Sequence, residues 1–390
     1  MISFNNTEIA FKHKSNRDLQ RANFLFRVIA SPTLVKVGKN VTNTSLAIGL
    51  PIKGIIRGTI FKQFCGGETI EECTSTIQVM WNSRVGTILD YSVEGKTSAE
   101  DFEATTNEII ATIAKAKGND AIPFAVFKVT GIARFGLLET TNDENATLSA
   151  ELQHEYDATI ARIDRICKAG FEADVPVFID AEETWIQDVI DRITHEMMLK
   201  YNKEKALIFN TLQIYRHDRF DFLQKSVEWA KANGIKYGVK LVRGAYMEKE
   251  RQRALDNDYP SPIQKDKTSC DEDYNRCLDY LTTEIEHIAL CAGTHNEASS
   301  LYLTELLAQK NITPNDQRIY FAQLLGMSDH ISYNLAHAGF NVAKYVPYGP
   351  IKEVMPYLLR RADENTSVKG QTGRELNLIL TEQNRRKAIK

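Results

Sequence analysis

The stretch Asn341-Val-Ala-Lys-Tyr-Val-Pro-Tyr-Gly-Pro350, followed by Tyr357-Leu-Leu-Arg-Arg-Ala-Asp-Glu-Asn365, decides the fold of this 390-residue chain. Its first part is an apolar run that ends in a Pro-Tyr-Gly-Pro turn, and its second part has the spacing of an amphipathic helix. One face of that helix carries positions i, i+3, i+4 and i+7, which are Tyr357, Arg360, Arg361 and Glu364. The stretch predicts a strand, a turn and a helix.

Seven similar β-rich runs precede this one, and helical patterns with charged outer faces lie between them. The eight runs cover residues 87–93, 124–130, 177–180, 207–215, 237–246, 288–295, 318–324 and 341–346. Strands that alternate with helices imply parallel pairing, and eight such units close a barrel. The sequence therefore predicts an α/β fold, a (β/α)8 TIM-type barrel with an N-terminal helical arm.

Polar residues interrupt these apolar runs mostly toward their C-terminal ends, where the active sites of such barrels lie. These residues are Glu94, Asp180, Gln213, Arg243, Thr294, His295 and Gln323. The pair Arg360 and Arg361 suits a bound carboxylate, because two adjacent guanidinium groups are buried only with an anion. The alternative for this pair is the solvated face of an ordinary amphipathic helix.

We expect three parts: residues 1–80 as the helical arm, residues 81–366 as the catalytic barrel and residues 367–390 as a C-terminal tail. Within the arm, residues 16–29 and a segment starting at Glu68 have helical patterns, and residues 50–64 are amphipathic and basic. We interpret the arm as a bracket packed on the barrel, with contact to an anionic membrane surface as the alternative. Residues 256–273, rich in Asp, Pro and Ser, are expected to form a loop that could act as a lid.

Composition excludes several classes of protein. The net charge of −3 gives no indication of nucleic-acid binding, and six cysteines without Cys-x-x-Cys spacing predict reduced thiols rather than a disulfide frame or a metal site. No apolar stretch approaches the roughly twenty residues of a membrane span, and the N-terminus lacks the apolar segment of a signal peptide. We expect a cytoplasmic protein, with peripheral association at the inner membrane, or a mitochondrial location in a eukaryote, as alternatives.

Five motifs in this order closely resemble those of proline dehydrogenases, over residues 81–365. They are Phe178-Ile-Asp-Ala-Glu-Glu183, Lys240-Leu-Val-Arg-Gly-Ala-Tyr246, Thr294-His-Asn296, Leu324-Leu-Gly-Met327 and Tyr357-Leu-Leu-Arg-Arg-x-x-Glu-Asn365. The resemblance implies a distorted barrel that holds FAD non-covalently, oxidises L-proline to Δ1-pyrroline-5-carboxylate and passes electrons to a membrane quinone. No Gly-x-Gly-x-x-Gly follows a predicted strand, so a Rossmann site for the flavin has no support.

The resemblance also assigns the substrate contacts. Lys128 joins Arg360 and Arg361 as a third cation for the substrate carboxylate, and Asp180 holds Lys128 or an arginine in place and is a candidate for handling the amine proton. An alternative for Asp180 is the N-cap of a helix. The ring is enclosed by Tyr345, Tyr357 and Leu324, each of which is also a plausible core residue. Glu94 pairs with the first arginine as a gate, or is a surface acid at the start of a helix.

The cofactor contacts follow in the same way. The position of Lys240 matches the residue that contacts flavin N5, although some relatives carry arginine there and lysine at the position of Arg243. The segment from Arg243 to Tyr246 resembles the one that wraps the ribityl chain and pyrophosphate. The full expected set is Ala181, Gln213, Lys240, Arg243, Gly244, Ala245, Tyr246, Thr294, His295, Asn296, Gln323 and Glu364, with Asp180, Lys240 and Lys128 as the catalytic group.

Three other functions stay open at this point. A hydroxyproline dehydrogenase is the nearest of them. The resemblance places Tyr345 against the ring carbon that carries the hydroxyl group in hydroxyproline, which implies L-proline as the substrate because a phenol there leaves no room for an added oxygen. A lyase could use Lys128 or Lys240 as a Schiff base on the same fold. A catalytically silent binding barrel is the third, although polar residues at most strand ends speak against it.

Overall fold

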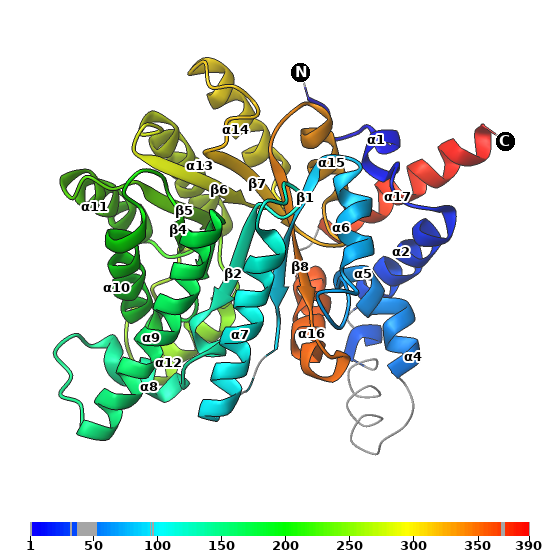
Figure 1. The fold of residues 1–390 in the computed structure, drawn as a ribbon. Coiled ribbons are helices and arrows are strands. Elements are labelled where there is room, and N and C mark those ends of the chain that lie inside the picture. The colour runs from blue at the N-terminus through cyan, green and yellow to red at the C-terminus, as the bar shows by residue number, and fades with distance from the viewer. Residues whose placement is uncertain are drawn as a thin grey trace. The chain divides into compact units, whose positions relative to one another are not determined.

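Eight parallel strands follow one another in chain order in a closed barrel (Figure 1). The computed structural model describes residues 2–31, 33–36, 53–93, 95, 97–367 and 371–389, with side chains up to residue 361 and from residue 373. The strands are β1 (Val85–Tyr91), β2 (Phe124–Lys128), β3 (Val177–Asp180), β4 (Ile208–Gln213), β5 (Tyr237–Val242), β6 (Ile288–Gly293), β7 (Ile319–Leu324) and β8 (Val342–Tyr348). The predicted fold class is confirmed, and every predicted strand overlaps an observed one.

The strands are buried almost throughout, as expected for a parallel sheet covered on both faces. In the sequence, helical patterns cover residues 16–29, 98–117, 218–232 and 297–309, and four observed helices match these spans closely. These are α2 (Asn16–Ile29), α7 (Ala99–Ala116), α11 (Arg219–Ala232) and α14 (Glu297–Gln309). The boundaries agree because capping side chains mark them: Ser15 caps α2 and Ser98 caps α7.

The chain divides into two compact units, residues 95–322 and residues 1–94 with 323–390. In the first unit β2 to β6 pair in order, and the register places Lys128 beside Asp180 and Thr211 beside Lys240. Near the starts of these strands the ring of Phe124 packs against Phe178 at 4.4 Å between centroids. The helices of this unit, besides α7, α11 and α14, are α8 (Phe135–Asn142), α9 (Ala150–Ala173), α10 (Thr184–Tyr201), α12 (Met247–Asp256) and α13 (Lys267–Thr283).

The second unit contains β1 paired with β8, so that Ile88 stands beside Tyr345. Its helices are α1 (Thr7–Phe11), α2, α4 (Lys53–Ile56), the π-helix η1 (Arg57–Phe61), α5 (Lys62–Phe64), α6 (Thr74–Trp81), α15 (Asp329–His337), α16 (Ile351–Ser367) and α17 (Gln371–Ala388). The apolar side of residues 53–64 is buried against α16, with Phe61 and Phe64 in one core with Tyr357. The segment thus packs on a helix of its own unit.

Two local expectations were wrong, and the predicted tail contains a helix that the sequence analysis did not name. Residues 68–73 form turns, and α6 begins only at Thr74. The irregular stretch expected at residues 256–273 is shorter and covers residues 257–266. It ends there because Asp266 caps α13, which begins at Lys267. The expected tail contains α17, whose Ile379 is buried in a core with residues of α1 and α2.

All six cysteines are free and buried. Among the residues that the structure describes, no helix is long and apolar enough to cross a membrane.

Candidate functional site

A carboxylate shared by two lysines lies at the C-terminal ends of neighbouring strands in the unit 95–322. Asp180 is the last residue of β3, and its carboxylate accepts a hydrogen bond from the ammonium group of Lys240 on β5. The ammonium group of Lys128, the last residue of β2, lies 3.6 Å from the other carboxylate oxygen. Parallel pairing of β2 through β5 puts these strand ends at one edge, which brings together three of the residues predicted from sequence.

The electrostatics keep this carboxylate ionised. Burial alone raises the pKa of Asp180, but the nearby charges of Lys240 and then Lys128 outweigh it, so the pKa lies below its ordinary value. Lys240 is almost fully buried, whereas the side chain of Lys128 remains 30 % exposed. Counted together, two ammonium groups and one carboxylate carry a net positive charge, which favours an anionic ligand.

Lys240 is also held by its surroundings. Its ammonium group lies 5.2 Å from the centre of the Phe178 ring, a cation–π contact that restricts where the charge can move. A second candidate cation, Arg243, follows β5 and lies in a different environment. The structure thus separates the two positions whose roles the sequence left interchangeable.

The Arg243 guanidinium group is fixed by three acceptors and a ring. It donates to Asp271 Oδ1 at 2.7 Å, to Thr294 Oγ1 at 2.6 Å and to Ser299 Oγ at 2.9 Å. The Tyr274 ring lies 4.3 Å from the guanidinium carbon. Burial raises the pKa of Asp271, but its hydrogen bonds from Lys267 and Arg243 outweigh that effect and the pKa is lowered. Arg243 is therefore a preorganised cation at the end of β5.

The segment after Arg243 brings backbone to the surface. Gly244 has φ +129°, and a Cβ there would come within 2.6 Å of the Tyr215 ring, so only glycine fits. Ala245 is exposed, and Tyr246 occupies the position directly before α12. Such a turn lets a large ligand approach the main chain closely.

Gln213, at the end of β4, is 3 % exposed, and its Oε1 has no hydrogen-bond donor among the residues that the structure describes. A buried acceptor without a donor is costly, and a ligand N–H would satisfy it. Gln213, Lys240, Arg243 and Gly244 together offer an acceptor, two cations and accessible backbone. This set fits a large anionic cofactor with a polar ring edge.

Three further cofactor candidates follow β6, and a fourth follows β3. Thr294 is buried, and besides accepting from Arg243 it accepts from the Asn296 amide at 3.1 Å. Asn296 caps α14, and His295 between them is half-buried. Ala181 is 9 % exposed directly after Asp180. Capping gives Thr294 and Asn296 a local structural task, whatever they contact in a ligand.

The other unit carries the predicted residues of α16. Arg361 is 9 % exposed, and its guanidinium carbon lies 5.1 Å from the centre of the Tyr357 ring one turn earlier. Arg360 is half-buried. The predicted common face is therefore observed for Tyr357 and Arg361, while the side chain of Glu364 lies outside the described part of the helix.

The remaining substrate candidates occupy β7 and β8. Tyr345 is 8 % exposed, and its carbonyl accepts from the Leu325 amide at 2.8 Å. Leu324 is half-buried against the core that contains Tyr357. Gln323, a predicted cofactor residue, accepts from Ser332 Oγ at 2.8 Å. Glu94, the predicted gate, lies outside the described residues.

Sequence reasoning gave no role to Glu182, which lies two residues after Asp180. Its carboxylate accepts from the backbone amide of Thr130, at 3.0 Å, and from the Thr130 hydroxyl, which ties the turn after β3 to the turn after β2. Burial raises the pKa of Glu182 to about 7, although the bonds from Thr130 act in the opposite direction. The Asp-Ala-Glu-Glu run was the available signal, but it does not show which acid is buried.

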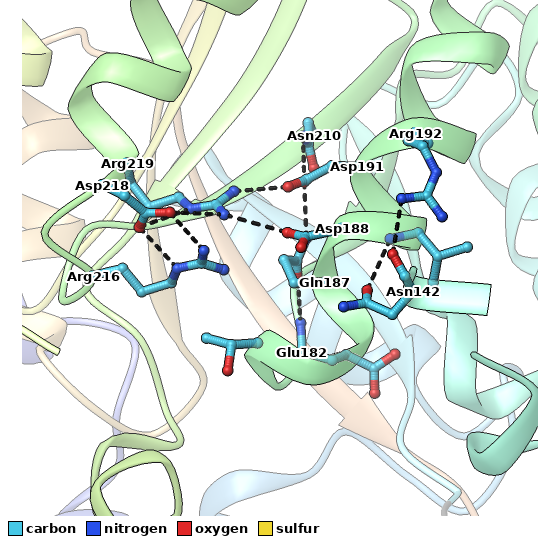
Figure 2. Close-up of polar contacts among 12 residues, drawn as sticks. Asn142, Glu182, Gln187, Asp188, Asp191, Arg192, Asn210, Arg216, Asp218 and Arg219 are labelled. Carbon is cyan, nitrogen blue, oxygen red and sulfur yellow. Dashed lines mark hydrogen bonds and ion pairs between the residues drawn. The ribbon is translucent and has the colours of Figure 1, made fainter. Parts of the chain in front are cut away.

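A buried polar network also holds the turn after β3 (Figure 2). The Glu182 amide donates to Gln187 Oε1 at 2.7 Å, and Gln187 donates to Asp191 Oδ1 at 2.9 Å. Asp191 also accepts from Asn210 at 2.9 Å and from Arg219 at 2.7 Å. The network joins α10, β4 and α11 and holds the backbone directly after Asp180.

A closed parallel barrel whose strand ends carry buried, paired charges is the architecture of a (β/α)8 enzyme. The family model described as proline dehydrogenase matches residues 73–374. The chain belongs to the proline dehydrogenase family, which confirms the family predicted from the five motifs. Membership implies a flavin cofactor.

Individual relatives agree with this assignment. The chain is 44 % identical over 230 residues to "Proline dehydrogenase 1, mitochondrial" of Homo sapiens, an alignment covering 58 % of this chain and 38 % of that protein. The protein of the same name from Dictyostelium discoideum is 32 % identical over 384 residues, covering 87 % and 67 %. The chain thus spans from about two fifths to two thirds of the length of these relatives.

A solved structure shares the fold. The crystal structure of proline utilization A (PutA) from Bdellovibrio bacteriovorus, inactivated by N-propargylglycine, aligns with a TM-score of 0.74 at 20 % identity. The alignment covers 93 % of this chain and 38 % of the PutA chain.

The raised pKa of Glu182 gives a pH-dependent prediction. A buried acid with a pKa near 7 binds its proton more tightly in the folded state than in the unfolded state, where the ordinary value is 4.5. Its presence therefore lowers the free energy of unfolding as the pH rises from about 4.5 to about 7, by at most about 3 kcal/mol. Glu182→Gln should gain stability relative to the natural protein over this range and hold the gain above it.

Urea unfolding at a series of pH values measures this difference. Thr130→Val, which removes the hydroxyl donor that lowers this pKa, should lose more stability than the natural protein over the same rise in pH. Parallel stability curves for Glu182→Gln and the natural protein would contradict the raised pKa.

Proposed function

We propose that the chain is an FAD-dependent proline dehydrogenase that oxidises L-proline to Δ1-pyrroline-5-carboxylate. The observation that carries the proposal is the Asp180 carboxylate between Lys240 and Lys128 at the strand ends of a barrel of this family. This cluster combines a net positive charge with side chains fixed by their neighbours. Both properties suit hydride removal from a small zwitterion, where position and electrostatic field are the protein's contributions.

The substrate carboxylate is assigned to cations. The side chain of Lys128 is 30 % exposed, and the guanidinium carbon of Arg361 lies 5.1 Å from the centre of the Tyr357 ring. Arginine binds a carboxylate through two parallel hydrogen bonds, which fixes orientation as well as affinity. We assign Arg360, Arg361 and Lys128 to the carboxylate, and Tyr345, Tyr357 and Leu324 to the ring.

Asp180 has a different task in this proposal. An acid whose pKa is lowered is a poor proton acceptor near neutral pH, since a general base works best with a pKa close to that of the medium. We therefore assign Asp180 to holding the two ammonium groups rather than to accepting the proton of the substrate amine.

FAD is the proposed form of the flavin, and when bound it supplies the hydride acceptor. Lys240 would donate to the ring near N5, Gln213 would accept from the ring edge, and Arg243 would neutralise the pyrophosphate. Asp271, Thr294 and Ser299 already hold Arg243 in a single orientation. This preorganisation lowers the entropy cost of binding the phosphates.

A quinone in a membrane is the proposed electron acceptor, and we propose that the chain docks on that membrane peripherally. Ile55 is 69 % exposed, and Lys53 and Lys62 lie exposed on the same short segment. Exposed apolar and basic side chains together suit the surface of anionic lipids. Arg57 is less available, because it donates to Glu72 at 2.9 Å. Such a membrane would be the inner membrane, of a bacterium or of a mitochondrion.

The visible spectrum of the purified protein tests the central proposal. We expect the two bands of an oxidised flavin, release of FAD rather than FMN on denaturation, and loss of the bands when L-proline is added without oxygen. Because the Tyr345 phenol restricts the pocket, kcat/KM for trans-4-hydroxy-L-proline should be roughly ten- to a hundredfold lower. If L-proline does not reduce the flavin after the protein is reconstituted with FAD, the proposal is rejected. If the protein prefers hydroxyproline, hydroxyproline becomes the assigned substrate.

The carboxylate assignment predicts the effect of removing one guanidinium group. Arg361→Met should raise the KM for proline at least tenfold, since a charge-assisted hydrogen bond contributes roughly 1.5–3 kcal/mol. The flavin content should stay that of the natural protein. Arg385→Met serves as the matched control, because Arg385 pairs with Glu382 within α17. If Arg361→Met keeps the KM for proline of the natural protein, this arginine does not belong to the site.

Membrane docking predicts a separable phenotype. The triple variant Lys53→Glu, Ile55→Glu and Lys62→Glu should lose sedimentation with anionic liposomes yet keep its activity with a soluble dye acceptor. The control variant Lys168→Glu, Phe171→Glu and Lys203→Glu changes an equal number of exposed residues in the other unit. Docking at this segment would be contradicted if the two variants sediment equally with liposomes, or if the natural protein does not sediment with them.

A further inference from the structure

Lys344 is the one charged residue of β8, and its side chain is only 1 % exposed. Its ammonium group lies 2.8 Å from Asp329 Oδ1 and donates to the carbonyl oxygens of Met327, at 2.6 Å, and Leu324, at 3.3 Å. The three acceptors surround the turn from β7 into α15, because Leu324 ends β7, Met327 lies in the turn and Asp329 begins α15. Since successive side chains of a strand point to opposite faces, Lys344 and its neighbour Tyr345 serve different sides of β8.

Such a lysine is costly to bury, and the contacts show what offsets the cost. Burial lowers the pKa of Lys344, while the charge of Asp329 acts to raise it. Three oxygens around one ammonium group satisfy its three donors, so the group is fully used inside the protein. Among the residues that the structure describes, its polar contacts are with Asp329, Met327 and Leu324, and of these only Leu324, through its backbone, is assigned to the proposed chemistry.

The turn that Lys344 holds has an irregular backbone. Gly326 has φ +78° and Ser328 has φ +51°, two left-handed residues within three positions. A Cβ at Gly326 would lie 2.1 Å from the Gln63 carbonyl oxygen, and the Gly326 carbonyl accepts from Gln63 Nε2 at 2.9 Å. Backbone of this kind persists only where the surroundings enforce it.

We propose that Lys344 is a positioning residue that holds residues 324–328 in the geometry the substrate pocket requires. The role rests on the proposed function, because Leu324 is assigned there to the proline ring. Asp329 adds a second connection to this turn, since its other carboxylate oxygen lies 2.8 Å from the ammonium nitrogen of Lys14. The N-terminal segment thereby fastens the same turn through a carboxylate shared by two lysines.

Lys344→Met tests this role, because methionine fills similar space without charge or donors. We expect amide hydrogen exchange in residues 324–329 to accelerate at least tenfold while most other segments keep their natural rates. In the same protein the KM for proline should rise at least tenfold, with kcat within about threefold and flavin content unchanged. This split separates loss of the pocket wall from general loss of structure.

Lys310→Met is the matched control. The Lys310 ammonium group also contacts an aspartate, Asp279, and its carbonyl, and it joins α14 to α13 in the other unit. Its loss should loosen those helix ends and leave the KM for proline unchanged. If Lys344→Met does not fold, the double variant Asp329→Asn and Lys344→Met removes both charges, and the same measurements apply to it.

The outcomes separate the two proposals. Three results for Lys344→Met would each overturn the positioning role. The first is unchanged amide exchange in residues 324–329, and the second is an equal acceleration of exchange throughout the protein. The third is a KM for proline equal to that of the natural protein although exchange in the turn is faster. If the natural protein does not oxidise proline, the proposed function fails, and the exchange comparison still decides whether Lys344 holds the turn.

Discussion

The Asp180 carboxylate shared by Lys240 and Lys128 is the interaction on which the charged part of the site depends. Without that carboxylate, two ammonium groups would face each other at the ends of buried strands, at a cost of several kcal/mol for each unpaired charge. With it, both lysines are fixed and one net positive charge remains. The backbone after Asp180 is fixed in turn by Glu182 and by the network around Asp191.

The fold was predictable because short-range sequence patterns determine its strands and most of its helices. Apolar runs, Ser98 and Asn296 as helix caps, and the Pro347-to-Pro350 turn each act within a few residues, so sequence alone located every strand. Sequence reasoning gave less where contacts between distant parts of the chain decide the structure. Residues 371–388 carry no strong stop or start signal, and one face of α17 is buried because α1 and α2 offer it an apolar surface.

The site was predictable in part and for a different reason. Lys128, Asp180 and Lys240 come together because each stands at or near the end of a strand, and a barrel gathers such positions. Glu182 and Lys344 were missed because nothing local distinguishes a buried charge from an exposed one. Their partners, Thr130 and Asp329, lie 52 and 15 residues away, a pairing that only the folded chain reveals.

Two carboxylates in this protein are each shared by two lysines, and exposure separates their roles. At Asp180 the Lys128 side chain is 30 % exposed, which supports its proposed contact with the substrate carboxylate. At Asp329 the Lys344 side chain is 1 % exposed, and its donors are already taken by oxygens of the chain. A lysine whose hydrogen bonds are all internal has none left for a substrate. The same residue types therefore stand next to a proposed ligand site at Asp180 and hold a turn of the chain at Asp329, and the exposure of the lysine side chains separates the two cases.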